Sequence, residues 1–103
     1  EAVEKAPSQV LADLSRVRLV KVLLEIEETD KAIQVLRDIK STGFSSSASE
    51  LRGDIHLVSG EEALANEAYN AAIEASGTNA ARLVLQMKAV DTAKVLDGKV
   101  IAD

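Results

Sequence analysis

The chain repeats itself with a period of 33 residues, and this internal repeat constrains the fold more than any other feature of the sequence. Shifting the sequence by 33 places sets Ala32 on Ala65 and Leu36 on Tyr69, so small and large apolar residues recur in the same order. A further step of 34 residues carries the match into residues 83–90. Repeats of this length are supersecondary units that stack on their neighbours to bury a shared core.

The spacing of apolar residues predicts two helices in the first copy. Residues that recur three and four apart indicate one helix over about 8–28. Thr29 or Asp30 can cap the next helix, which Gly43 is expected to end. Residues 1–7 are interpreted as the last turns of a helix from a preceding copy.

Capping residues predict the later helix boundaries. Ser47 with Glu50, and Ser59 with Glu62, have the S-x-x-E spacing of a capping box, which predicts two further helix starts. These two helices are expected to end at Gly60 and Gly77. A fifth helix is expected to start at Thr78 or Asn79 and to run to about Leu96. Residues 97–103 show no helical pattern.

The second copy resembles the tetratricopeptide repeat, a helix-turn-helix unit with the pattern W-x2-L-G-x2-Y, then A-x3-F, then P. Gly53, Ala65, Tyr69 and Ala72 match that pattern, whereas Ser49 and Arg52 lack the expected large apolar side chains. The repeat predicts structural roles for six positions: Ala32, Leu36, Gly53, Ala65, Tyr69 and Ala72.

We therefore expect an all-α protein in which tetratricopeptide-like antiparallel helix pairs stack as a short right-handed solenoid. With one Phe, one Tyr and no Trp, the chain has few of the aromatic residues that favour β-strands, which argues against a β-sheet protein. The chain forms one predicted domain over residues 1–103, because 103 residues leave no room for a second. Its predicted parts are the end of a preceding helix at 1–7, a helix pair at 8–43, a second pair at 44–77, a capping helix at 78–96 and a tail at 97–103.

Gly53 lies within the adhesion-like tripeptide Arg52-Gly53-Asp54. In a tetratricopeptide-like unit the first-helix glycine lies where the second helix crosses closely, here at Ala65. Gly53 would then accept a helix-propensity cost of ~1 kcal/mol for a contact that a Cβ obstructs. An adhesion ligand needs an exposed flexible loop, so a helical tripeptide is predicted to have no adhesive role.

Three longer sequence segments indicate a protein family. "DKAIQVLRDIKSTGF", "ASELRGDIHLVSGEEALANEAYNAAIEAS" and "LVLQMKAVDTA" resemble the C-terminal half of the ancillary SecYEG translocon subunit (YfgM-like) family over about Leu11 to Ala93. This resemblance implies a non-enzymatic domain on the periplasmic side of the bacterial inner membrane. The implied partners are translocon subunits, periplasmic chaperones and unfolded or emerging chains. It also implies an N-terminal membrane anchor that is absent from this sequence, which begins with Glu1.

Composition argues against several other functions. A net charge of −5 without a basic cluster does not favour nucleic acid or anionic membranes as partners. No cysteine is present, and Asp54 and His56 lie ~200° apart around a helix, so we expect no metal site and no cofactor. His56 is predicted to be packed or partly buried. The serines of 45–49 lack a G-x-S-x-G elbow, so we expect no catalytic residues.

A stack of repeats has a concave face formed by the first helix of each pair, which predicts a binding groove. Three classes of function stay open: a protein-binding module, an enzyme fragment and a structural spacer. The binding module would belong to a translocon subunit or, alternatively, would be a generic soluble tetratricopeptide adaptor. Apolar groove positions argue against the spacer. The groove positions predicted from the repeat are Lys21, Leu24, Glu50, Asp54, Leu57, Val84, Lys88 and Asp91.

Overall fold

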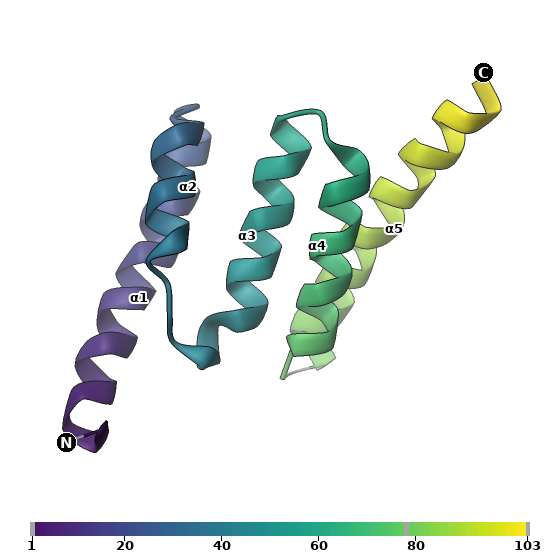
Figure 1. Cartoon of the computed structure of the whole chain (residues 1–103). Coiled ribbons are helices and arrows are strands. Elements are labelled where there is room, and N and C mark those ends of the chain that lie inside the picture. The colour runs from purple at the N-terminus through teal and green to yellow at the C-terminus, as the bar shows by residue number, and fades with distance from the viewer. Residues whose placement is uncertain (1, 78, 103) are drawn as a thin grey trace.

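The computed structural model describes the backbone of residues 2–77 and 79–102, with side chains for 8–77 and 82–93. All regular elements in these ranges are helical: α1 (Ala2–Glu25), α2 (Thr29–Arg37), the 3-10 turn η1 (Thr42–Phe44), α3 (Ser45–Val58), α4 (Glu62–Ala75) and α5 (Asn79–Ala102). Consecutive helices run antiparallel in an elongated array of 56 × 31 × 16 Å (Figure 1). The predicted all-α class is confirmed.

The 33-residue repeat is visible in the backbone of two turns. Glu28 N–H donates to the Leu23 carbonyl at 2.8 Å, and Glu61 N–H donates to the His56 carbonyl, also at 2.8 Å. Both bonds close the carboxyl end of a helix, as in a Schellman motif. The residue before each donor has positive φ, 64° at Glu27 and 79° at Gly60. The predicted break at Gly60 is confirmed, and Glu27 adopts the same geometry although it carries a Cβ.

The predicted helix caps are wrong by one to three residues. Helix α2 follows Glu28, α3 follows Phe44 and α4 follows Glu61, and none of these residues makes a side-chain capping bond. Ser59 cannot start α4, because its N–H bonds to the Ile55 carbonyl and its backbone ends α3. Ser47 lies inside α3 because η1 leads directly into Ser45. The predicted caps Thr78 and Asn79 lie outside the described side chains.

The predicted ends of the first and last helices are also corrected. Helix α1 runs from Ala2 to Glu25 without a break at Pro7, so residues 2–7 belong to the same helix. Pro7 lacks an N–H and removes one hydrogen bond, but it does not stop this helix. Helix α5 runs on to Ala102 through a segment without an apolar stripe. Propagation adds one backbone bond for each residue fixed, so an established helix extends without such a stripe.

Helix α2 ends at Arg37 rather than near Gly43 because Asp13 of α1 takes over the next backbone donors. The N–H groups of Lys40 and Ser41 donate to Asp13 Oδ2 at 3.1 and 2.8 Å, and Arg16 Nη1 donates to Oδ1 at 2.7 Å. The Asp13 side chain has 0% exposure. Ser41 and then the other donors lower the pKa of Asp13 to about 2 against the opposing effect of burial. The Ser41 hydroxyl itself is buried without a hydrogen-bond partner among the described residues.

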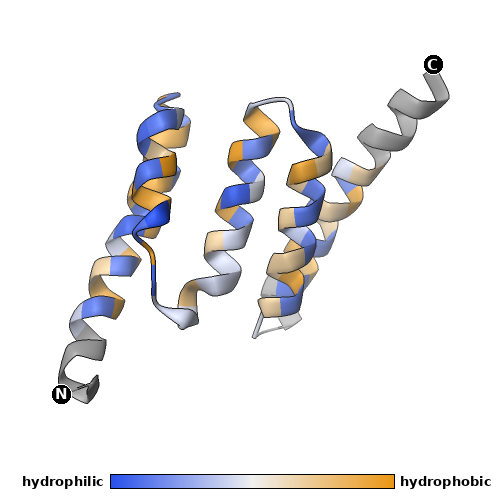
Figure 2. Cartoon of the chain, in the orientation of Figure 1, coloured by the Kyte–Doolittle hydropathy of each residue, from blue (hydrophilic) through white to orange (hydrophobic). Residues whose placement is uncertain are grey.

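The core follows the repeat. One buried cluster joins α1, α2 and α3, and a second joins α4 and α5 around Tyr69. Hydrophilic and hydrophobic residues mix along the described helices (Figure 2), and none of those helices is long and apolar enough to cross a membrane. Each of the six structural repeat positions is buried: Ala32, Leu36, Gly53, Ala65, Tyr69 and Ala72.

Gly53 is a packing glycine within α3, as predicted. A Cβ added at Gly53 would lie 2.5 Å from Tyr69 Cε1 and 2.7 Å from Cδ1, closer than real Cβ contacts. The Tyr69 ring is 1% exposed and has no space to move aside. The residue that requires the glycine is therefore Tyr69, while Ala65, expected at the crossing, is buried on the same helix one turn earlier.

Gly53→Ala should lower the free energy of unfolding. Overpacking costs ~1–3 kcal/mol, which exceeds the ~1 kcal/mol that alanine gains over glycine within a helix. Gly43→Ala is the control, because no atom lies within 4 Å of a Cβ there; it should change stability by no more than about 0.5 kcal/mol. Urea denaturation followed by circular dichroism measures both. An equal response of the two variants would contradict the close contact.

The lowered pKa of Asp13 predicts that the folded chain loses stability in acid. Its folded pKa of about 2 lies below the ordinary value of 3.8, so the stability it contributes is present above pH ~4 and is lost as pH falls toward 2. Asp13→Asn should lower the free energy of unfolding at pH 7 by about 2 kcal/mol, and this difference should shrink below pH ~4. Asp91→Asn, at an exposed carboxylate, is the control. A pH-independent difference for Asp13→Asn would refute the assignment.

Candidate functional site

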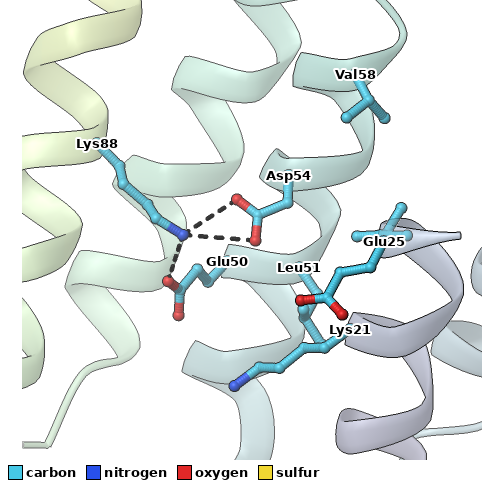
Figure 3. Close-up of a pocket in the computed structure, with 8 residues that line it drawn as sticks. Lys21, Glu25, Glu50, Leu51, Asp54, Val58 and Lys88 are labelled. Atoms are coloured by element: carbon cyan, nitrogen blue, oxygen red, sulfur yellow. Dashed lines mark hydrogen bonds and ion pairs between the residues drawn. The ribbon is translucent and has the colours of Figure 1, made fainter. Parts of the chain in front are cut away.

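A groove of about 410 Å³ runs across the faces of α1, α3 and α5. Residues of α3 one and two turns apart form its floor, α1 forms one wall, and a lysine of α5 forms the other (Figure 3). Charged side chains alternate there with aliphatic ones. The lining residues are Lys21, Leu24, Glu25, Glu50, Leu51, Asp54, Val58 and Lys88.

A cluster of charged side chains joins α5 to α3 across the groove. Lys88 Nζ lies 2.7 Å from Glu50 Oε2 and 3.2 Å from Asp54 Oδ1 (Figure 3). The Tyr69 hydroxyl donates to Asp54 Oδ1 at 2.6 Å, and Lys88 Nζ lies 5.5 Å from the centre of the Tyr69 ring. Asp54 therefore connects α3 to both α4 and α5.

The protonation states in this cluster follow from burial and charge. Burial alone would lower the pKa of Lys88, but the hydrogen bond to Glu50 and the negative charges of Asp54 and Glu50 outweigh it, so the pKa is raised. Burial, and then the hydrogen bond to Asp54, raises the pKa of Tyr69. At neutral pH Lys88 is charged and Tyr69 is a neutral donor. Lys88 thus forms ion pairs with both Glu50 and Asp54.

Five of the eight predicted groove positions meet in this groove: Lys21, Leu24, Glu50, Asp54 and Lys88. Leu57, Val84 and Asp91 are exposed outside it, and the prediction had omitted three lining residues, Glu25, Leu51 and Val58. Glu25 and Val58 lie four residues after Lys21 and Asp54, so the helical rule of i and i+4 would have found them. Leu57 is 43% exposed but does not line the groove.

His56 lies outside the groove and is partly buried, as predicted. Its Nδ1 is 2.9 Å from Glu61 Oε1, a contact that closes the turn between α3 and α4. Sequence reasoning missed this carboxylate because Glu61 is five residues away, beyond the helical spacings of three and four. Within the described residues, no group of three or more His, Cys, Asp or Glu side chains is placed to hold a metal ion.

The paired helices and the groove across successive first helices define a helical-repeat domain. The chain belongs to the tetratricopeptide repeat-like domain family, whose model matches residues 1–94. The predicted fold family is confirmed.

Two curated relatives extend this result. The chain is 31% identical over 96 residues to the Ancillary SecYEG translocon subunit of Escherichia coli strain K12 and 27% identical over 84 residues to that of Aggregatibacter actinomycetemcomitans. Each match covers 82% of this chain, but 47% and 41% of those relatives, so the chain spans less than half their length. The resemblance predicted from the sequence is confirmed. No solved structure is significantly similar to the chain.

The charged cluster predicts measurable coupling between Lys88 and Asp54. In a double-mutant cycle with Lys88→Met and Asp54→Asn, the coupling energy should be about 1 kcal/mol and should fall at 1 M salt. The Lys31–Glu28 pair is the control, because both side chains are largely exposed and 3.9 Å apart; its coupling should be near zero. Equal coupling in both pairs would show that the cluster does not hold α5 to α3.

Proposed function

We propose that this domain is a non-enzymatic protein-interaction module of an ancillary Sec translocon subunit, on the periplasmic side of the inner membrane. It links the translocon to chaperones or emerging chains, which bind in the groove. The observation that carries this proposal is the single groove formed by three successive first helices, in a chain related to proteins named ancillary SecYEG translocon subunits.

The chemistry of the groove supports a peptide as the ligand. Leu24 and Val58 offer apolar contacts, and Val58 is 63% exposed. Lys21 is exposed and makes no ion pair with a described residue, so its charge is available to a partner. Lys88 is already held by two carboxylates. A partner would therefore bind mainly through Lys21, Glu25 and the apolar side chains between them.

A photo-crosslinker at Val58 of the intact, full-length protein in cells tests the proposal. It should capture translocon subunits, periplasmic chaperones or emerging chains. The matched control is a crosslinker at Leu64, an exposed apolar residue of α4 that does not line the groove. Lys21→Glu should reduce capture from Val58 without unfolding, because exposed-surface changes usually shift stability by about ±0.5 kcal/mol.

Capture of those partners from Leu64 but not from Val58 would overturn the groove assignment. Capture from Val58 of proteins unrelated to translocation would instead favour an adaptor of another complex. No capture from either position, with the protein folded, would favour a spacer. A turnover lost on His56→Ala in a folded protein would contradict the non-enzymatic assignment.

A further inference from the structure

A second surface lies on another side of α3, along its seam with α2. Two hollows of about 230 and 250 Å³ adjoin there, and both are lined by Arg52. The first has an apolar floor of Ile33, Leu36 and Ile55, and the second includes Ile39 and Phe44. The α3 residues that line the first hollow, 52, 55 and 56, differ from the groove residues 50, 51, 54 and 58, so the two surfaces lie on different faces of this helix.

The side chains along this seam are positively charged, whereas the chain as a whole has a net negative charge. Arg37, Lys40 and Arg52 line the hollows together with His56, and no carboxylate lines either one, although the chain carries a net charge of −5. None of the three cations forms an ion pair with a described residue; the Arg52 side chain only reaches Ser49 Oγ, at 3.5 Å. His56, which also lines the first hollow, contacts the carboxylate of Glu61 at 2.9 Å.

We propose that the seam between α2 and α3 binds a short segment of a partner protein that carries carboxylates next to aliphatic side chains. The guanidinium groups of Arg37 and Arg52 match carboxylates in geometry as well as charge. Aliphatic side chains of the segment fill the hollows, whose volumes are below the ~300 Å³ typical of small-molecule sites. This inference is independent of the groove and of the proposed function.

A peptide fits the seam better than a membrane does. An anionic bilayer presents a charged plane to the whole domain, and a net charge of −5 opposes that approach. A short segment contacts only the local cations, and its side chains reach floors that lie between two helices. The apolar and basic residues of the seam alternate within one turn of each helix, which suits alternating aliphatic and acidic residues.

The test is a titration of the isotope-labelled chain with the peptide acetyl-Asp-Leu-Asp-Leu-Glu-amide, followed by amide chemical shifts in NMR. We expect shifts confined to α2, η1 and the adjoining face of α3, and weaker binding as salt is added. A peptide with Asn and Gln in place of the acids should bind at least about tenfold more weakly.

Matched charge reversals locate the site. Arg37→Glu with Arg52→Glu should weaken binding at least about tenfold. Arg18→Glu with Lys31→Glu, which reverses the same number of exposed charges outside the seam and the groove, should change it less than about twofold. Circular dichroism verifies the fold of both variants. Equal losses, shifts in the groove, or no shifts at about 1 mM peptide would overturn the proposal. So would binding of the chain to phosphatidylglycerol vesicles that the seam variant abolishes while the peptide fails to bind.

Discussion

The close contact between Tyr69 and Gly53 is the constraint on which the rest of the structure depends. The glycine lets the ring of α4 lie against α3, and the ring then places its hydroxyl 2.6 Å from Asp54. Asp54 in turn holds Lys88 of α5. A single steric requirement inside the second helix pair therefore also fixes the position of the last helix, and with it one wall of the groove.

Much of this arrangement was predictable from the sequence because it depends on periodicity. The 33-residue shift pairs Ala32 with Ala65 and Leu36 with Tyr69, and all four are buried. The same shift identified Gly53 as a packing residue and located five groove residues. Local spacing is sufficient for such features, since a helix places residues three and four apart on one face.

The contacts that the sequence did not predict join residues at other separations. Asp13 meets the backbone of Lys40 and Ser41 from 27 and 28 residues away, and no motif marks a side chain that ends a helix in another element. His56 and Glu61 meet across a turn whose geometry had to be known first. The serine caps failed for a related reason, because backbone bonds of the preceding turn had already fixed the conformation of Ser59.

The paired turns at Glu27 and Gly60 have a consequence for how the helix pairs present their first helices. A residue with positive φ and an equivalent backbone hydrogen bond end the first helix of both pairs, so both second helices start from the same turn geometry. The first helices α1, α3 and α5 then lie on one side of the array, where they share the groove. Under the proposed function, each further unit would add one first helix to the surface available to a polypeptide, and the side chains of that helix would select its composition.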